Sequence, residues 1–348
     1  MQSFAASFIS EQLITQRLLQ TIRTIGEYKG KQELFKEQAP QVLQTLRQAA
    51  LIQSTESSNR IEGITVPLSR LKELIAEKTS PRDRSEQEIA GYRDVSNTIH
   101  TSYAHIPFTP GIVLQLHRDL YQFTVGEGGR WKLVDNVISE TRPDGTKLVR
   151  FEPVKAYATS AAMERLHQEF NSLWQSGEVE PLLLIATYIL DFLCIHPFND
   201  GNGRMARLLT LLLLYKAGYE VGRFISLERI VERTKESYYD TLYQSSQNWH
   251  QGQHSLLPWW DYFLGVVVLS AYREFEQRVG LVSKVKGAKT AMVLDAIGSM
   301  PGDFSIKDLL ERCPTVGIDL IRRLLRRERE AGHLECLGRG PDARWRKK

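Results

Sequence analysis

Twelve consecutive residues near the middle of the chain concentrate side chains that can do chemistry. The segment 196–207 reads HPFNDGNGRMAR and holds a histidine, a carboxylate, two amides, two glycines and two arginines. It lies between two apolar runs, 182–195 and 208–215, which are typical of buried helices. A polar loop between two core helices has no reason in packing alone, so it indicates a binding or catalytic site.

The residue types of this loop suit the binding of a nucleoside triphosphate. Gly201 and Gly203 allow the backbone to turn tightly and to approach a ligand closely. The helix expected to begin near Arg204 presents unpaired N–H groups and the positive end of its dipole, which together favour an anion. Arg204 and Arg207 lie on one face of the first turn, where two guanidinium groups can hold separate phosphates.

The same segment supplies a candidate metal ligand and a candidate base. Asp200 offers hard carboxylate oxygens beside the expected phosphates, where Mg²⁺ would bind. His196 lies where Pro197 ends the preceding helix, and its imidazole could accept a proton from an attacking hydroxyl group. The alternative is a glycine-rich turn with surface arginines. That alternative does not explain a histidine, a carboxylate and two arginines in one short loop.

This segment also resembles the signature of a known family. It matches the pattern HPFx(D/E)GNGRxxR of Fic (Fic/Doc) proteins at every specified position, and so long a pattern is rarely matched by chance. The resemblance implies a protein adenylyltransferase (AMPylase), which moves AMP from ATP to a Tyr, Ser or Thr hydroxyl group of a target protein or of itself. It also implies ATP as substrate and Mg²⁺ as cofactor.

The resemblance gives each position of the motif an expected role. The roles are those of a general base, a metal ligand, an anchor in the core and a set of nucleotide ligands. In that order they fall on His196, Asp200, Phe198 and, for the phosphates, Gly201, Asn202, Gly203, Arg204 (β-phosphate) and Arg207 (γ-phosphate).

A second motif lies upstream, where a predicted helix ends at Glu62 and Gly63. The glycine fits a helix C-cap, but a carboxylate there opposes the helix dipole, and spacing alone favours an exposed glutamate without a partner. The stretch Ser58-x-x-x-Glu62-Gly63 resembles the (S/T)xxxE(G/N) inhibitory motif of Fic proteins. The resemblance implies an inhibitory helix near 54–63, in which Glu62 pairs with Arg207 and obstructs the γ-phosphate.

Residues 125–153 interrupt the helical pattern and predict a β-hairpin. Residues 131–138 alternate loosely, the sequence Pro143-Asp144-Gly145 is a turn signal, and residues 148–151 are a candidate return strand. An isolated hairpin is marginally stable by itself, and a surface decoration is the plain interpretation.

The Fic resemblance makes this hairpin a flap near 130–153, which holds a segment of the target by strand addition and covers the nucleotide. It implies that Val137 and Ile138 contact the adenine. Tyr239 and Leu242 likewise resemble a YYxxL helix that lines the adenine pocket, whereas the residues alone allow an aromatic face packed in the core. The Arg that the family usually has in the flap is replaced here by Lys132.

Composition and length bound the remaining possibilities. The 348 residues, 42% hydrophobic and 25% charged, are ordinary for a globular protein of two or three domains. Three cysteines without metal-ligand spacing favour a reducing compartment. The longest apolar run, 182–195, is too short to span a bilayer, and the N-terminus lacks the pattern of a signal peptide. We therefore expect a cytoplasmic protein without a membrane partner.

The N-terminal residues 10–50 have apolar positions at helical spacing. They predict two amphipathic helices with Gly30 at the turn between them, and their apolar faces leave a homodimer open. Three scattered histidines, His100, His105 and His117, lack metal-ligand spacing and are expected to be structural.

Basic character is confined to the C-terminal part. Residues 284–348 hold 15 Lys and Arg against 9 Asp and Glu, whereas the rest holds 30 against 32. The order of three helices and a β-hairpin predicts a winged helix-turn-helix. Its third helix carries Arg322, Arg323, Arg326, Arg327 and Arg329, and its wing tip carries Arg339. These arginines could bind DNA phosphates, but winged helices also pack against proteins, so both partners stay open.

The predicted fold is mainly α, with a Fic-type helical core, a β-hairpin flap and a small C-terminal winged-helix domain. The expected regions are an N-terminal helical region (1–54), the Fic core (55–280) and the winged helix-turn-helix (285–348). Two alternatives to adenylyl transfer remain. One is a DNA-binding regulator whose Fic core senses nucleotide. The other is an enzyme that removes AMP, with Glu62 positioning the water.

Overall fold

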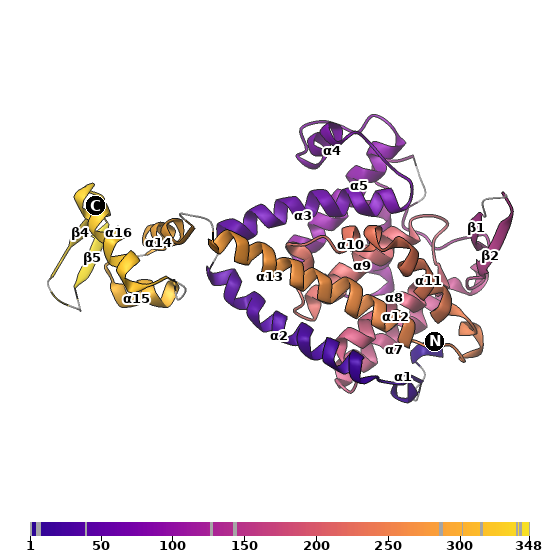
Figure 1. Cartoon of the computed structure of the whole chain (residues 1–348). Helices are drawn as coiled ribbons and strands as arrows, with labels where there is room; N and C mark the ends of the chain where they lie inside the picture. The colour runs from indigo at the N-terminus through magenta and orange to yellow at the C-terminus, as the bar shows by residue number, and fades with distance from the viewer. Residues whose placement is uncertain are drawn as a thin grey trace. The chain divides into compact units, whose positions relative to one another are not determined.

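The computed structural model describes every residue except 1, 5–7, 39, 126–127, 142–144, 285–287, 301, 314–315, 339, 341–342 and 348. The chain is mainly helical with two small antiparallel sheets, as the predicted fold class requires (Figure 1). It divides into two compact units. The larger comprises Met1–Lys29 and Leu46–Arg273, and the smaller comprises Gly30–Thr45 and Glu274–Lys348.

The helices from residue 2 to residue 284 follow one another along the chain, and one two-stranded hairpin interrupts them between α6 and η2. In chain order they are η1 (Gln2–Phe4), α1 (Phe8–Glu11), α2 (Gln16–Gln38), α3 (Pro40–Ile61), α4 (Leu68–Ile75), α5 (Arg84–Ser102), α6 (Pro110–Leu120), η2 (Ala156–Ala158), α7 (Thr159–Ser176), α8 (Pro181–Ile195), α9 (Asn202–Lys216), η3 (Val221–Arg223), α10 (Leu227–Arg233), α11 (Lys235–Ser246), η4 (Trp249–Gln251), α12 (Leu257–Trp260), the π-helix η5 (Asp261–Val268) and α13 (Leu269–Lys284).

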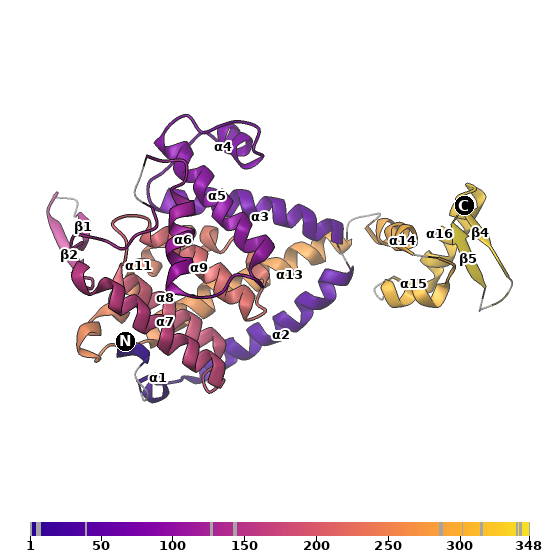
Figure 2. The same ribbon diagram turned by 180° about the vertical axis from the view of Figure 1, so that it is seen from behind.

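Helices α8 and α9 form the centre of the larger unit. Every residue of α8 from Leu182 to Ile195 is buried, because this helix is apolar on all sides and has neighbours on all sides. Helix α9 packs along α8, with α5, α7, α11 and α12 around the pair (Figures 1 and 2). The loop 196–201 therefore has both of its ends fixed in the core.

The predicted turn at Gly30 is wrong. Helix α2 continues through Gly30 to Gln38, and the next helix begins at Pro40. Glycine costs only about 1 kcal/mol inside a helix. Proline, by contrast, is favoured at the first helical position, where its missing N–H group is not needed.

The hairpin consists of β1 (Ile138–Thr141) and β2 (Lys147–Phe151), paired antiparallel with an irregularity after Ile138. The segment 131–137, expected to form part of the first strand, is irregular, because its polar groups bond to the loop before α9 instead of to a strand. Two residues of the predicted turn, Pro143 and Asp144, lie outside the described residues.

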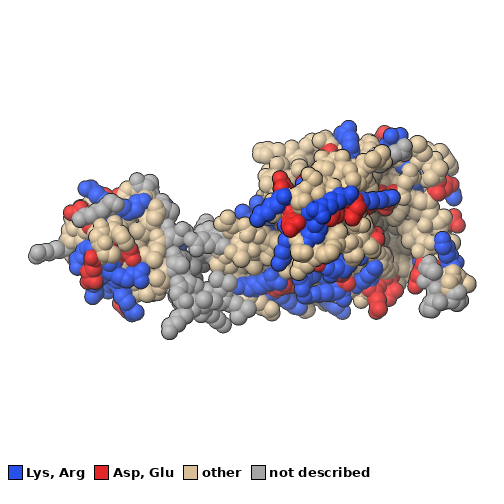
Figure 3. Space-filling model, turned by 90° about the horizontal axis from the view of Figure 1, so that it is seen from above, with Lys and Arg blue, Asp and Glu red and all other residues tan. Residues whose placement is uncertain are grey.

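The C-terminal part of the smaller unit has its own core. Its elements are α14 (Ala288–Ser299), β3 (Phe304–Ser305), α15 (Ile306–Arg312), α16 (Ile318–Glu330), β4 (Leu334–Cys336) and β5 (Arg344–Lys347), with the strands in the order β3-β5-β4. Buried side chains from all three helices and the sheet pack together. Basic and acidic side chains both appear on its surface (the smaller body in Figure 3). Arg339 lies outside the described residues.

Within the described part of the chain, none of the helices combines the length and the apolar composition needed to cross a membrane.

Candidate active site between helices α8 and α9

His196 ends helix α8 in an unusual backbone conformation. Its φ of 50° and ψ of 61° are left-handed, which few residues other than glycine adopt, and this turns the chain out of the helix. Its Nδ1 lies 3.3 Å from the carbonyl oxygen of Leu193, which can only accept, so Nδ1 carries the proton and Nε2 keeps its lone pair. Burial lowers the pKa of His196 to about 4. The imidazole is therefore neutral at pH 7 and can accept a proton.

Asn202 closes the loop on itself. Its Oδ1 accepts the backbone N–H of Phe198 at 2.9 Å, and its Nδ2 donates to the Phe198 carbonyl at 2.8 Å. The Phe198 ring is fully buried and stacks on His117 with a centroid distance of 3.6 Å. The predicted core anchor is thus in place. The Asn202 side chain is used in loop closure, and the phosphate contact predicted for it stays a prediction.

His117 also holds this loop, although in the sequence it is only an isolated histidine, expected to be structural. The Gly129 N–H donates to Nδ1 at 3.0 Å, so Nε2 carries the proton and donates to the carbonyl of Asp200 at 3.1 Å. Burial lowers the pKa of His117 to about 4, which keeps this neutral tautomer. One imidazole therefore joins the glycine segment before the flap to the candidate metal ligand.

The base of the flap binds the other side of the loop. Lys132 donates its backbone N–H to Pro197 at 2.8 Å, and its Nζ to the carbonyl of Ile195 at 3.0 Å. The Asn136 Nδ2 donates to the carbonyl of Phe198 at 3.0 Å. Burial lowers the pKa of Lys132 to about 8. The irregular segment thus replaces strand pairing with bonds that fix the carbonyl groups around His196.

Asp200 and Gly201 lie at the start of α9. Gly201 has a φ of 81°, and a Cβ there would come within 2.9 Å of the Tyr121 hydroxyl, so the position requires glycine. Asp200 accepts the Gly201 N–H through Oδ1 at 2.7 Å, while 62% of its side chain is exposed. Among the described residues no three His, Cys, Asp or Glu side chains form a metal cluster. Asp200 alone still suits Mg²⁺, which commonly binds one carboxylate together with substrate phosphates.

The two arginines of the motif bind different helices. Arg204 is 1% exposed and donates from Nη1 to Glu88 of α5 at 2.6 Å and from Nη2 to the hydroxyl of Tyr121 at 2.7 Å. A buried guanidinium needs such a carboxylate partner. Because this side chain is already paired, its contact with a β-phosphate stays a prediction.

Arg207 binds the end of α3. It donates from Nε to the Ser58 hydroxyl at 2.8 Å and from Nη2 to the Ser58 carbonyl at 2.9 Å and to Glu62 Oε1 at 2.7 Å. Burial opposes the Arg207 charge, but the Glu62 carboxylate outweighs it and raises the pKa of Arg207. The structure thus forms the ion pair that the two separated motifs predict.

Glu62 also lies against the first turn of α9. A Cβ on Gly203 would come 2.3 Å from Glu62 Oε1, so the missing side chain makes room for the carboxylate. At the C-terminus of α3 this charge is unfavourable, whereas beside the N-terminus of α9 it is favourable. The carboxylate therefore lies where the helix would otherwise attract an external anion.

The flap lies beside α11, which carries the candidate adenine ligands. Arg150 of β2 lies over the Tyr243 ring at 4.8 Å, and β2 packs along α11. Tyr238 is buried against Trp259 in the core, while the neighbouring Tyr239 is 45% exposed. One ring of the aromatic pair thus packs in the core and the other is partly exposed, and contact of Tyr239 with an adenine stays a prediction.

The other predicted adenine ligands have exposed or half-buried side chains. Val137 is exposed on the flap, and Ile138 and Leu242 are half-buried. Their contact with a base stays a prediction.

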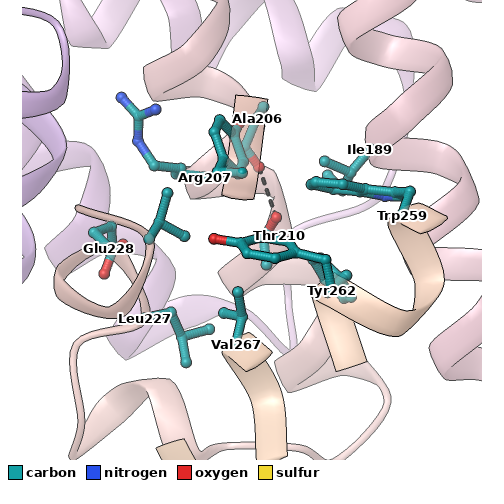
Figure 4. A pocket seen from close by; sticks show the side chains of 12 residues that line it. Ile189, Ala206, Arg207, Thr210, Leu227, Glu228, Trp259, Tyr262 and Val267 are labelled. Carbon is teal, nitrogen blue, oxygen red and sulfur yellow. Dashed lines mark hydrogen bonds between the residues drawn. The ribbon is translucent and has the colours of Figure 1, made fainter. Parts of the chain in front are cut away.

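Two cavities border α9 and its loop. A small one of about 30 Å³ lies inside the core, between Arg207, Glu228 and the rings of Trp259 and Tyr262 (Figure 4). Its lining is mainly apolar, and the Glu228 carboxylate is already bound by the hydroxyl of Tyr92 at 3.0 Å. We therefore regard it as a packing feature.

The second cavity, of about 360 Å³, opens beside Asn199 and Asp200 and is large enough for a small ligand. Its other lining residues come from α5, α6 and the base of the flap; they are Arg84, Gln87, His117, Tyr121, Thr124, Val125, Arg130, Trp131 and Leu133.

The lowered pKa of His196 gives a pH prediction. An imidazole in an unfolded chain titrates near ~6.5, so between about pH 6.5 and 4 the unfolded chain binds a proton that folded His196 does not. His196 should therefore destabilise the fold as the pH falls through this window. We expect the His196 NMR signal, assigned with His196→Gln, to titrate near pH 4. A midpoint of about 6.5 would contradict the buried, neutral geometry.

Comparisons with known proteins agree with this site. Residues 107–214 match the profile of the Fic/DOC family. The "Protein adenylyltransferase Fic" of Drosophila grimshawi is 28% identical over 187 residues, 52% of this chain and 36% of that protein. The protein of the same name from Nematostella vectensis is 25% identical over 179 residues, 49% of this chain and 39% of its own length. The chain thus spans little more than a third of these relatives.

Solved structures share the fold. A Fic family protein from Desulfovibrio desulfuricans G20 superposes with a TM-score of 0.63 at 23% identity, over 97% of both chains. Fic-1 of C. elegans, residues 134–508 with the change E274G, gives a TM-score of 0.57 at 18% identity, over 75% of this chain and 71% of that chain. Residues 107–214 thus match a Fic/DOC family domain, and the chain is similar to proteins named Fic protein adenylyltransferase.

Proposed function

We propose that this chain is a protein adenylyltransferase, which moves AMP from ATP to a Tyr, Ser or Thr hydroxyl group of a target protein or of itself. The observation that carries the proposal is the pairing of a neutral histidine with an anion site. His196 presents an unprotonated Nε2 at one end of a six-residue loop, and the positive end of α9 begins at the other. A base beside a phosphate site is the requirement for nucleotidyl transfer to a hydroxyl group.

In this mechanism the Nε2 of His196 takes the proton of the target hydroxyl group. The hydroxyl oxygen then forms a bond to the α-phosphorus of ATP, the bond between that phosphorus and the bridging oxygen breaks, and pyrophosphate leaves with the electron pair. Asp200 would hold Mg²⁺, which neutralises charge on the phosphates. The bonds from Lys132 and Asn136 to the loop keep the imidazole oriented while it changes charge.

The start of α9 would hold the phosphates. The backbone N–H groups of Gly201, Asn202 and Gly203 and the helix dipole suit the α- and β-phosphates. Arg207 would bind the γ-phosphate through Nη2, the donor that now binds Glu62. Arg204 would contact the β-phosphate while it still binds Glu88. Its positive charge would then be shared between the phosphate and the Glu88 carboxylate.

Glu62 would then act as an inhibitor that is part of the same chain. Its carboxylate binds the Arg207 donor and lies against Gly203, the place that this proposal gives to the γ-phosphate. Two anions cannot share that place, so ATP binds in a reactive position only when Glu62 leaves. Low basal activity follows from this competition.

Glu62→Gly should raise ATP-dependent adenylylation of the chain itself by about 10- to 100-fold, since one charge-assisted bond contributes about 1.5–3 kcal/mol. Adding His196→Ala should abolish the gain. Intact mass after incubation with ATP and Mg²⁺ measures both. Glu77→Gly is the matched control, because Glu77 is exposed, follows a helix and has a φ of 55° that glycine adopts freely.

No mass gain with Glu62→Gly would contradict the inhibition and the reaction together. If instead the wild type removes AMP from a previously modified protein, and Glu62→Gly does not, the chain catalyses the removal reaction.

We also propose that the C-terminal part of the smaller unit is a winged helix-turn-helix that binds DNA. Helix α16 buries Ile321, Leu324 and Leu325. Five arginines of this helix are exposed, namely Arg322, Arg323, Arg326, Arg327 and Arg329. Two of them have carboxylate neighbours on the same helix, since Arg322 lies 4.0 Å from Asp319 and Arg327 pairs with Glu328 at 2.9 Å. A cationic stripe along the third helix suits the phosphates that border a DNA groove.

The chain should shift a labelled duplex at low salt. Replacing Arg322, Arg323 and Arg326 with Gln should weaken the shift strongly. The slope of log K against log salt should fall in magnitude by about 2.7, at about 0.9 per lost contact. The control with Lys72, Lys78 and Arg165 changed to Gln loses the same charge from exposed positions of the larger unit and should bind like the wild type. Equal loss in both variants, or no shift at all, would contradict a DNA site and leave a protein partner for this domain.

A further inference from the structure

The position of Glu62 is set by the last turn of α3. The Glu62 N–H and the Ile64 N–H both donate to the carbonyl of Asn59 at 3.0 Å, and Gly63 takes a φ of 82°. The chain therefore reverses directly after Glu62. Whatever holds this turn in place also holds the carboxylate against Arg207.

Two contacts join this turn to α10 and α11. Lys235 donates from Nζ to the carbonyl of Ile61 at 3.0 Å. Arg60 donates from Nη1 to Glu232 of α10 at 3.1 Å and also pairs with Glu56 of its own helix. Neither contact includes Glu62 or Arg207, so both can be changed without removing an atom of the Glu62–Arg207 ion pair.

The positive charge of Lys235 is better placed for binding α3 than for stabilising its own helix, α11. Lys235 is the first residue of α11, where a positive charge opposes the dipole of its own helix. At the C-terminus of α3 the same charge is favourable, because it binds a carbonyl that the helix leaves unpaired. Glu62 has the same relation to α9. Each charge is unfavourable for its own helix and favourable for the neighbouring one.

Lys235 is also close to the candidate adenine site. Its Nζ lies 5.8 Å from the centre of the Tyr239 ring, one helical turn further along α11. The first turn of α11 thus lies beside both the candidate adenine site and the last turn of α3, which carries Glu62. A shift of α11 on nucleotide binding would move the Lys235 ammonium that binds the last turn of α3.

We infer that Lys235, supported by the Arg60–Glu232 pair, is a positioning residue that holds Glu62 in the inhibitory position and couples its release to binding at α11. This inference rests on the proposed function. The contacts are partly exposed, with 46% of the Arg60 side chain and 21% of the Glu232 side chain accessible. Such contacts are individually weak, so their loss should release Glu62 in part.

The test compares Lys235→Met with Lys235→Arg, which can still donate to the Ile61 carbonyl, and with Lys72→Met at an exposed site on α4. At low ATP we expect Lys235→Met to raise self-adenylylation about three- to tenfold, mainly through a lower KM. Lys235→Arg and Lys72→Met should match the wild type. Combined with Glu62→Gly, Lys235→Met should add nothing, because there is no carboxylate left to release.

Hydrogen exchange of the amides at 60–64 without ATP gives a readout independent of activity. Faster exchange in Lys235→Met, but not in Lys235→Arg or Lys72→Met, supports the positioning role even if Glu62→Gly shows the proposed reaction to be wrong. Unchanged exchange overturns it. The double variant gives a second way to overturn the inference. If Glu62→Gly is active and adding Lys235→Met to it lowers that activity, Lys235 acts on nucleotide binding directly.

Discussion

A buried guanidinium at the start of a helix needs an anion, and this requirement organises the site. Arg207 is 6% exposed and lies in the second turn of α9, near the N-terminal end, where the helix dipole also favours negative charge. Glu62 supplies the anion from the end of α3, at a point where its own helix disfavours it. Removing the carboxylate without a replacement would leave a buried charge unpaired. In the proposed reaction the γ-phosphate is that replacement, so activity and inhibition follow from one electrostatic need.

The loop between α8 and α9 can present this site because the surrounding structure fixes it from three sides. The core helices hold its ends, Asn202 closes it internally, and His117 and the base of the flap bind its carbonyl groups. Its backbone polar groups are therefore used in holding its shape. The groups that this bonding leaves for a ligand are the Nε2 lone pair of His196, the exposed Asp200 carboxylate and the N–H groups at the start of α9. A loop held in this way keeps its side chains in position for catalysis.

The sequence predicts the parts of this site that are local. The motif, the helix ends at Glu62 and His196 and the alternation of polar and apolar segments all have signatures in short stretches. The pair formed by Glu62 and Arg207 could be predicted only by combining two motifs. Contacts such as Lys132 with Ile195, or Arg204 with Glu88, join segments far apart in the chain without any fixed spacing. The segment 131–137 differs from the prediction because tertiary hydrogen bonds replace strand pairing there. Gly30 differs because one glycine costs too little to end a helix.

The central claim is that Glu62 and the γ-phosphate occupy the same place. Calorimetric titration of the wild type and of Glu62→Gly with AMP and with ATP tests it most directly. If the claim holds, Glu62→Gly tightens the binding of ATP by about tenfold or more, equivalent to ~1.4 kcal/mol, and leaves the binding of AMP nearly unchanged. An equal effect on both nucleotides, or none on either, would contradict it.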